Sequence, residues 1–374
     1  MVLRAFMTVD PGAEEQACME LMLLGFAGVA RKGYVEFEAG PEDLVRIAYR
    51  SQVARRVLVA LGDGPVREGV GDLRTRVRWD VLESLCPSEA SFAVRCERQG
   101  LHEFRTLEVE EEVGSWVGGE FPSWSVRLDQ PQVLIHLWVC EDACAVGVDV
   151  AGRDLSKREY RVFIGAHSLK GSLAAALLRF AGFERGKVLL DPFCGSGVIP
   201  IEAAFMDMGV SAQRFRKGFA CSSLTGFGAW NRLLQEEDGR ASDASHTITG
   251  FDPNLACISS AKKNAKIAGV VKAIVFSKVD AEWIDLKFEE GSVDVIATHP
   301  PQVSNNVSAA RIDPVYNEFF HQARFVLRKD GVLALMTGQP DHVKVHAAAK
   351  GLVLVGEQKV FSGQMGLWML RYRK

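Results

Sequence analysis

Residues 187–197 read Lys-Val-Leu-Leu-Asp-Pro-Phe-Cys-Gly-Ser-Gly, an apolar stretch that runs into an aspartate and a tight glycine turn. Val188–Leu190 is short and apolar, which is typical of a buried parallel strand. The pattern Val198–Met208 predicts a helix whose free N–H groups and positive dipole end face the turn. Gly195 and Gly197 allow backbone angles closed to other residues and let the backbone approach a ligand. The segment therefore predicts a ligand-binding strand, turn and helix.

The details of this turn favour one class of ligand. A glycine turn between strand and helix is common to nucleotide, dinucleotide and S-adenosylmethionine sites. No Lys follows Gly197, which argues against a phosphate-binding loop, and Val198-Ile199-Pro200 departs from a dinucleotide fingerprint. The wording resembles the first motif of class I S-adenosylmethionine-dependent methyltransferases, in the branch that methylates exocyclic amines of bases. An ordinary β–α turn is the alternative. The resemblance implies cofactor binding by Asp191, Phe193, Cys194, Gly195, Ser196 and Gly197.

A second predicted strand, Thr247–Phe251, also leads to an acidic residue, Asp252, which is followed by Pro253. The amphipathic segment Leu255–Ala268 then predicts a helix that stops at Gly269. A carboxylate at the tip of this strand can accept hydrogen bonds from both ribose hydroxyls of a nucleotide-like ligand. The resemblance assigns that contact to Asp252, beside Pro253, and a helix-capping aspartate is the alternative.

The C-terminal half continues to alternate between strands and helices. Ala273–Lys278 predicts a strand that leads to Asp280 and Ala281, and the resemblance implies that Asp280 binds the adenine amino group. The remaining predicted elements are the strands Val293–Ala297, Gly331–Met336, Leu352–Lys359 and Leu367–Tyr372 and the helix Val315–Leu327. This alternation predicts a mostly parallel, Rossmann-like α/β sheet with ligands at the carboxyl ends of its strands. The site residues named so far are all expected at that edge.

A tetrapeptide after the fourth strand, His299-Pro300-Pro301-Gln302, supplies the catalytic candidates. Amine methylases of this kind usually carry Asn or Asp, then Pro-Pro, then an aromatic residue. The enzyme mainly has to orient the amine for in-line transfer. A neutral His299, also expected beside the cofactor, can accept one hydrogen bond, so His299 and the Pro300 carbonyl are expected to share the amine. Gln302 has no ring, so base stacking must be weaker or come from Phe361, Trp368 or Phe215.

The first half of the chain lacks this alternation before residue 165. Its predicted elements from Leu3–Val9 to Val53–Leu61 suggest a small α+β, ferredoxin-like unit. A helix over Gly71–Leu85 and two long strands, Gln132–Val139 and Ala145–Val150, are expected after it. The wording within residues 95–112, with Arg-Gln-Gly at 98–100 and His-Glu-Phe-Arg-Thr at 102–106, resembles the THUMP domain, an RNA-binding module of tRNA-modifying enzymes.

The junction between the halves extends the resemblance to the whole chain. Residues 146–149 lead into 155–161 and then into His167-Ser168-Leu169-Lys170, which resembles the THUMP-containing guanine-N2 RNA methyltransferases. The resemblance implies cofactor contacts for Ser168 and Leu169. Residues 214–231 match the family's insertion, with Arg214, Phe215, Arg216, Phe219 and Trp230. We expect a ferredoxin-like domain over 1–68, a THUMP domain over 69–155, a linker over 156–165 and a methyltransferase domain over 166–374.

Composition is consistent with an intracellular enzyme. The 374 residues are 48% hydrophobic, enough to bury two or three cores. No stretch has the apolar length of a membrane span and no basic-then-apolar leader opens the chain, so a cytoplasmic protein without membrane contact is expected. The eight cysteines include no Cys-x-x-Cys, and Cys140 and Cys144 lack partners at metal spacing, so reduced thiols and no metal are expected. A monomer is expected, and an activating protein partner stays open.

The net charge of −3 argues against a protein that coats nucleic acid, but the basic residues are clustered. Such clusters can neutralise the phosphates of a folded RNA. Solvated helix faces paired with Asp and Glu are the alternative. The clusters comprise Arg46, Arg50, Arg55, Arg56, Arg67, Arg74, Arg76 and Arg78, then Lys157, Arg158 and Arg161, and finally Arg214, Arg216 and Lys217.

Three functions remain open from the sequence. The first is an active guanine-N2 methylase with a variant site, and the intact turn and strand-end aspartates favour retention of S-adenosylmethionine. The second is an RNA-binding protein that keeps the cofactor fold but has lost catalysis. The third is a methylase of another acceptor group. A THUMP domain in this architecture implies recognition of the single-stranded 3′ end of tRNA, so tRNA is the expected substrate and ribosomal RNA the alternative.

Overall fold

The computed structural model describes residues 1–66, 69–165, 168–216 and 218–374. Its contacts divide the chain into two compact units. The first, unit 1, comprises Met1–Leu155 and Arg216–Gly239, and unit 2 comprises Ser156–Phe215 and Arg240–Lys374. Three residues singled out from the sequence, Arg67, His167 and Lys217, lie outside the described residues. No helix among the described residues is both long enough and apolar enough to cross a membrane.

Unit 2 is built on a seven-stranded sheet with the order β11-β10-β9-β12-β13-β15-β14. The five strands from β11 to β13 pair in parallel, and only β15 runs antiparallel to its neighbours. This confirms the predicted mostly parallel sheet. Its strands are β9 (Leu189–Asp191), β10 (Ile248–Asp252), β11 (Ile274–Lys278), β12 (Val293–Thr298), β13 (Leu327–Thr337), β14 (Val353–Ser362) and β15 (Met365–Arg373).

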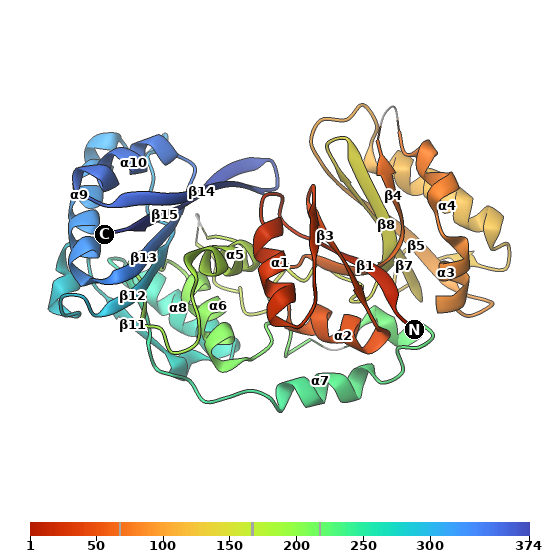
Figure 1. Ribbon diagram of the computed structural model, residues 1–374, viewed down its shortest axis with the longest axis horizontal. Coiled ribbons are helices and arrows are strands. Elements are labelled where there is room, and N and C mark those ends of the chain that lie inside the picture. The colour runs from red at the N-terminus through yellow and green to blue at the C-terminus, as the bar shows by residue number, and fades with distance from the viewer. Residues whose placement is uncertain (67–68, 166–167, 217) are drawn as a thin grey trace. The chain divides into compact units, whose positions relative to one another are not determined.

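Helices cover both faces of this sheet (Figure 1). Helices α5, α6 and α8 pack on one face, while α9, α10 and the short η4 pack on the other. The helices are α5 (Gly171–Ala181), α6 (Val198–Met208), α8 (Leu255–Ile267), α9 (Ala309–Val326), α10 (Pro340–Ala349), η3 (Val271–Ala273) and η4 (Ala281–Leu286). Helix α9 begins six residues earlier than the predicted helix, and its sixth residue is Pro314, which cannot donate the hydrogen bond to a carbonyl of the preceding turn.

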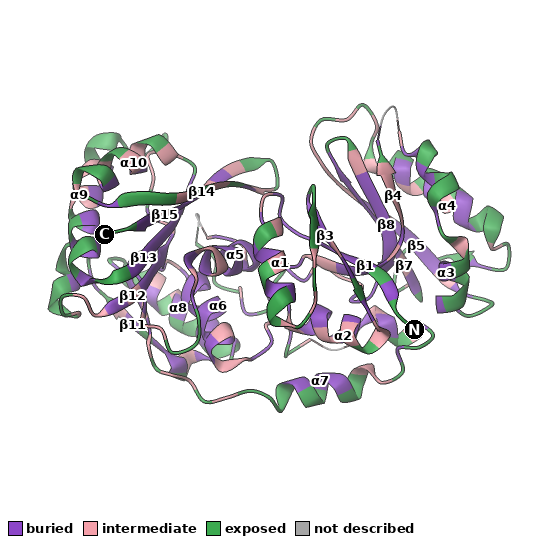
Figure 2. Cartoon of the chain, in the orientation of Figure 1, coloured by how far each residue is buried: buried purple, intermediate pink, exposed green. Residues whose placement is uncertain are grey.

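The core of unit 2 explains why its central strands read as continuous apolar runs. Leu190 of β9 and Ile296 of β12 are fully buried between the two helical layers, as are Phe319 and Phe320 of α9. Figure 2 shows the buried residues concentrated along the central strands and on the sheet-facing sides of the helices. A parallel sheet buried on both faces leaves polar side chains only at the strand ends. The carboxyl ends are therefore where chemistry can be placed.

Unit 1 is built on one eight-stranded sheet with the order β2-β3-β1-β4-β8-β7-β5-β6. Its strands are β1 (Leu3–Thr8), β2 (Val29–Arg31), β3 (Tyr34–Ala39), β4 (Arg56–Pro65), β5 (Ser91–Gln99), β6 (Ser125–Val126), β7 (Val133–Cys140) and β8 (Ala143–Asp149). Strand β4 pairs with β8 along most of its length, from Leu58↔Asp149 to Pro65↔Ala143. The ferredoxin-like and THUMP regions therefore share one continuous sheet, which the sequence pattern did not indicate.

The helices of unit 1 depart from expectation at one place. They are α1 (Glu14–Leu23), α2 (Pro41–Arg50), α3 (Trp79–Leu85), α4 (Thr106–Glu120), α7 (Trp230–Asp238), η1 (Gly71–Arg76) and η2 (Ala220–Ser223). The single helix predicted over Gly71–Leu85 is wrong, because Val77 is extended and separates η1 from α3. The N–H of Arg78 donates to the carbonyl of Leu61 at 2.8 Å instead of continuing a helix.

The segment Arg216–Gly239 leaves unit 2 and packs with unit 1. Phe219 is buried edge-on against Tyr49 of α2, with ring centroids 6.3 Å apart. The Tyr49 hydroxyl donates to Asp238 at 2.6 Å. The sequence placed this segment inside the range 166–374, because nothing in its own composition names its packing partner. Chain order and spatial unit therefore differ here.

Acidic partners occupy many of the expected basic residues. Arg55 and Arg56 both bond to Glu97, inside unit 1. Arg158 is buried in unit 2 and donates to Glu202 at 2.8 and 3.2 Å. Ion pairs also engage Arg46, Arg50 and Arg78. These residues therefore have the acidic partners that the paired-face alternative expects, although Arg158 is buried and does not lie on a solvated face. Arg74 and Arg76 are exposed, and no ion pair within the described part of the chain involves them.

Candidate functional site

The turn after β9 has the conformation that its glycines predict. Gly195 and Gly197 have φ values of +52° and +85°, in the region that favours glycine. At Gly197 a Cβ atom would lie 2.9 Å from the Cβ of Ala261, so α8 packs directly on the turn. At Gly195 a Cβ would meet nothing within 4 Å. Gly197 thus allows the turn to pack against α8, and Gly195 leaves space beside the turn for a ligand.

Asp252, at the end of β10, ties the turn to the second strand. Its Oδ2 accepts the N–H of Gly195 at 3.0 Å, and its Oδ1 accepts the N–H of Asn254 at 2.9 Å. The Asn254 side chain in turn caps α8 by accepting the N–H of Ala256 at 2.9 Å. The helix cap is therefore Asn254, and the capping alternative raised for Asp252 is wrong. The carboxylate instead sets the distance between two strand ends.

Asp191, at the end of β9, is a fully buried carboxyl group. Its Oδ1 accepts the hydroxyl of Thr298 at 2.7 Å and the N–H of Phe193 at 3.2 Å. Burial, with a smaller contribution from nearby Asp252, raises the pKa of Asp191 to about 7 against the lowering effect of these two bonds. A cation beside Asp191 would favour the carboxylate form. The sequence did not indicate the Thr298 contact, because Thr298 lies on a different strand.

Two further predicted cofactor residues lie beside the turn. The Ser168 hydroxyl is 3.1 Å from that of Ser196, and Arg161 donates to the Ser168 Oγ at 3.3 Å. Leu169 is buried next to Ser168. Asn264 of α8 donates to the carbonyl of Ser196 at 2.9 Å. Ser168 and α8 are therefore hydrogen-bonded to the glycine turn, and the cofactor contacts expected of Ser168 and Leu169 stay a prediction.

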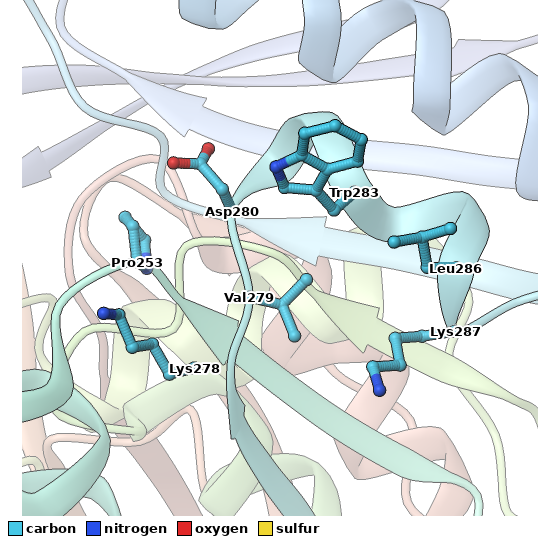
Figure 3. Close-up of a pocket in the computed structure, with 7 residues that line it drawn as sticks. All are labelled: Pro253, Lys278, Val279, Asp280, Trp283, Leu286 and Lys287. Atoms are coloured by element: carbon cyan, nitrogen blue, oxygen red, sulfur yellow. The ribbon is translucent and has the colours of Figure 1, made fainter.

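A cavity of 340 Å³ opens where β10 and β11 end (Figure 3). Such a volume is in the range of small-molecule sites. The lining residues are Pro253, Lys278, Val279, Asp280, Trp283, Leu286 and Lys287. Asp280 is exposed here and Ala281 is buried beneath it. Trp283, which the sequence analysis did not single out, is 53% exposed. Its backbone N–H donates to the backbone carbonyl of Asp280 at 3.0 Å. An indole face beside a carboxylate suits a planar heteroaromatic amine.

The ring of His299 has a defined orientation. Its Nδ1 lies 2.8 Å from the carbonyl of Met336, the penultimate residue of β13. A carbonyl can only accept, so Nδ1 carries a proton in the neutral ring and Nε2 is the hydrogen-bond acceptor. The Nε2 atom lies 3.5 Å from the amide nitrogen of Gln302. The acceptor nitrogen of His299 therefore lies on the side of the ring that faces Gln302, and its expected role toward an amine stays a prediction.

Gln302 and Pro301 are held by residues distant in sequence. The Gln302 Oε1 accepts the N–H of Gly338 at 2.8 Å and lies 3.4 Å from the Thr337 hydroxyl. Tyr316 of α9 is fully buried and donates its hydroxyl to the Pro301 carbonyl at 2.7 Å. Gln302 thus anchors the tetrapeptide to the end of β13, a role that sequence reasoning did not predict.

The three aromatic candidates for base stacking lie at different places. Phe215 packs near Gly269, after the end of α8, which is the amino-end edge of the parallel strands. Trp368 of β15 pairs with Thr337, at the carboxyl end of β13 beside Gln302. Phe361 lies nearer the tip of the β14–β15 hairpin, paired with Gly366. Phe215 is therefore wrong as a partner of the tetrapeptide, and Trp368 is the best placed.

Comparison with known proteins gives three family matches. A model of RMKL-like methyltransferase domains matches residues 158–367, more than half of the chain. A THUMP domain model matches residues 76–149. A model of the RlmL ferredoxin-like domain matches residues 4–58. The matches follow the order expected from the sequence.

Individual relatives are similar over nearly the full length. A tRNA (guanine(6)-N2)-methyltransferase from Methanocaldococcus jannaschii is 29% identical, covering 96% of this chain and 97% of its own. The enzyme of the same name from Archaeoglobus fulgidus is 28% identical, covering 91% and 84%. TrmN from Thermus thermophilus has a solved structure with a TM-score of 0.69 at 26% identity, covering all of both chains. A putative methyltransferase complexed with SAH superposes with a TM-score of 0.80 at 21% identity, covering 100% of this chain and 98% of its own.

Proposed function

This chain belongs to the family of RMKL-like methyltransferase domains, and on that premise we propose that it methylates the exocyclic N2 of a guanosine in tRNA. The observation that carries the proposal is the His299–Gln302 tetrapeptide, whose acceptor nitrogen lies at the same sheet edge as the glycine turn. The relatives named as tRNA (guanine(6)-N2)-methyltransferases favour guanosine 6 as the target. S-adenosylmethionine is the cofactor of the family.

The residues at the sheet edge fit this cofactor. The open side of Gly195 admits the ligand, and we assign the methionine part to the turn Asp191–Gly197 with Ser168 and Leu169. We assign the ribose to Asp252 and the adenine to the cavity at Asp280, where Pro253 and Trp283 would contact the ring and Ala281 follows Asp280 in the chain. When bound, the cofactor supplies an electrophilic methyl group. Its positive charge is matched by the two aspartates at the first and second strand ends.

The tetrapeptide orients the acceptor amine. The His299 Nε2 accepts one N–H of the guanine amino group, and the Pro300 carbonyl accepts the other. With both protons held in the plane of the base, the nitrogen lone pair is directed out of that plane, toward the methyl donor. The Pro301 carbonyl accepts the hydroxyl of Tyr316, which holds the residue that follows Pro300 in place. The His299 Nε2 can then receive the proton that the methylated amine loses.

Base stacking and RNA docking fall to other residues. We assign stacking to Trp368, since Gln302 is engaged with Gly338. We assign RNA docking to the first 155 residues, with the ferredoxin-like domain over 1–68 and the THUMP domain over 69–155. Arg74 and Arg76, which are exposed, are candidates for phosphate contacts. The linker over 156–165 would then lead into the catalytic region over 166–374.

The experiment uses the full chain, methyl-labelled S-adenosylmethionine and an unmodified tRNA transcript, with mass spectrometry of the digested nucleosides. N2-methylguanosine is expected, and a transcript with adenosine in place of guanosine 6 should receive no methyl group. Methylation of a ribosomal RNA fragment but not of tRNA would show that the substrate is ribosomal RNA and not tRNA. Label on another nucleoside would change the acceptor atom. Cofactor binding without methylation of any RNA would support a non-catalytic RNA-binding protein instead.

A further inference from the structure

A second group of polar side chains lies on the outer helices of unit 2. Asp313 of α9 faces His342 and His346 of α10, which are four residues apart and so share one face of their helix. The Asp313 Oδ1 lies 2.7 Å from the Nε2 of His342 and 3.4 Å from the Nε2 of His346. One candidate ligand atom from each of the three residues lies within 4.8 Å of the others. All three side chains are partly exposed, so an ion could enter from solvent.

The tautomer of His346 leaves a place for a cation. Its Nδ1 lies 3.3 Å from the amide oxygen of Asn317, so Nδ1 is the protonated nitrogen of the neutral ring. The Nε2 lone pair then faces the Asp313 carboxylate, which is also an acceptor. Two acceptors that face each other need a proton or a metal ion between them. Metal-binding histidines almost always donate their other ring N–H to an oxygen acceptor, and Asn317 supplies such an oxygen to His346.

The spacing of the three atoms fits a tetrahedral site. Zinc bonds to histidine nitrogen and carboxylate oxygen are about 2.0–2.2 Å long, which separates neighbouring ligand atoms by roughly 3.4 Å. The His346 Nε2 is already at that distance from the Asp313 Oδ1, and His342 needs only a small side-chain movement. We propose that Asp313, His342 and His346 bind one first-row transition-metal ion, Zn²⁺ in the first instance, with water as the fourth ligand. No ion is present in the structure.

The proposed site adjoins the tetrapeptide through one side chain. The Tyr316 ring lies between them, with centroid distances of 5.2 Å to His342 and 5.6 Å to His346. Burial and the nearby Asp313 raise the pKa of Tyr316, so its hydroxyl remains a donor to the Pro301 carbonyl. The neighbouring cation on α10, Lys344, is paired with Glu357 at 2.5 Å and does not compete for the carboxylate of Asp313. A bound ion would link α9 to α10 next to Tyr316 and so restrict the movement of the side chain that bonds to Pro301.

The test is a calorimetric Zn²⁺ titration of the full chain after removal of metal with a chelator. One saturable site is expected. His342→Gln and His346→Gln, which keep most of the side-chain volume, should each weaken binding at least 100-fold. Asn317→Ala should weaken it about 10–100-fold, as loss of a supporting hydrogen bond does. The matched control is His321→Gln, because His321 is an exposed histidine of α9 outside the cluster. This variant should bind Zn²⁺ with the same affinity as the wild type.

Substitution of Co²⁺ identifies the ligand atoms independently. A nitrogen and oxygen site gives visible d–d bands without a thiolate charge-transfer band, whereas binding at any of the eight cysteines gives that band. A thiolate band, equal Zn²⁺ affinity in the His342→Gln and His346→Gln variants, or no saturable binding in the wild type would each overturn the proposal. The last result would leave the cluster as a proton-linked ion-pair network. None of these readouts depends on methyl transfer, so they do not test the proposed function.

Discussion

The glycine turn and the tetrapeptide lie at the same edge of one sheet but are held in place differently. The turn from Asp191 to Gly197 is fixed by its own glycine conformations and by Asp252 at the adjacent strand end. The tetrapeptide is fixed by β13 and α9, through Met336, Gly338 and Tyr316. The backbone conformation of the turn comes from glycines inside the motif, and its bond to Asp252, 57 residues from Gly195, adds to that local geometry. The tetrapeptide has no such glycines, and the contacts that hold it come from residues 15 to 37 positions further along the chain.

This difference separates two kinds of variation at the site. A turn that carries its own geometry cannot lose a glycine without losing the fold or the ligand. The tetrapeptide is held partly by its own side chains, since His299 and Gln302 bond to Met336 and Gly338. The bond from Tyr316 goes to a backbone carbonyl, so it does not depend on which residue occupies position 302. A side-chain change in the tetrapeptide should therefore remove one support and keep another, whereas a change at Gly195 or Gly197 alters the backbone of the turn itself.

The largest effect is expected from a pair of glycine substitutions in the turn. Gly197→Ala places a Cβ at positive φ and 2.9 Å from Ala261, and should cost roughly 2–5 kcal/mol of unfolding free energy. Gly195→Ala meets no atom within 4 Å and should cost only about 1 kcal/mol, but it should obstruct cofactor binding. Chemical denaturation and calorimetry with S-adenosylmethionine measure the two quantities. Equal losses of stability in the two variants would contradict the proposal that Gly197 is needed for packing and Gly195 for ligand binding.

Asp252→Ala should produce the next largest effect, on cofactor affinity. The change removes the proposed ribose contact and also frees the N–H groups of Gly195 and Asn254. Loss of a charged hydrogen-bonding group costs about 1–3 kcal/mol, or roughly 5- to 150-fold in the dissociation constant of S-adenosylmethionine. The control is Asp243→Ala, an exposed aspartate that precedes β10 at the other edge of the sheet. An unchanged affinity in Asp252→Ala would remove this residue from the site.

The same contrast explains how far the sequence could predict the molecule. The glycine turn and the strand-end aspartates were found from local spacing, and helix α6 was predicted at its observed bounds, Val198–Met208. The Gln302 anchor, the Thr298 bond to Asp191 and the packing of the segment from Arg216 with unit 1 were not. Each of these joins residues whose separation is set by the fold. A local pattern carries no information on which distant element will supply the partner.

The histidine cluster was missed for a related reason. The sequence analysis looked for metal ligands among the cysteines, whose spacing is visible along the chain. His342 and His346 have helical spacing, but their carboxylate partner lies 29 residues before His342, on another helix. Only the packing of α9 against α10 brings the three together.

A smaller, directional effect is expected at His299. If Nε2 accepts the amine proton, then protonation of the ring converts an acceptor into a donor and methyl transfer should slow as pH falls. His299→Asn restores an acceptor that does not titrate, so the acid limb should disappear while the rate is kept or raised. His299→Ala should lower the rate about tenfold or more with little change in cofactor affinity. Single-turnover rates across pH, with Gln302→Ala as the control that keeps the imidazole, measure this.

A wild-type profile that is flat across the imidazole range would remove the acceptor role from His299. The same conclusion would follow if His299→Ala were as active as the wild type, and the Pro300 carbonyl alone would then hold the amine. A Gln302→Ala variant that loses the acid limb would show that the pH dependence requires the contact between Gln302 and the His299 Nε2.

The smallest effect concerns the titration of Asp191. Because burial raises its pKa to about 7, the folded protein binds a proton there that the unfolded chain releases near its ordinary pKa of 3.8. Its contribution to stability is therefore present at low pH and is lost as pH rises from about 4 through 7. A cationic cofactor favours the carboxylate, so S-adenosylmethionine affinity should fall up to tenfold per pH unit below about 7. Asp191→Asn keeps an Oδ1 acceptor for Thr298 and Phe193 and should flatten both dependences. Calorimetry from pH 5.5 to 8 in buffers of different ionisation enthalpy would detect the proton released on binding, and a wild-type affinity that is independent of pH would place the charge of the cofactor away from Asp191.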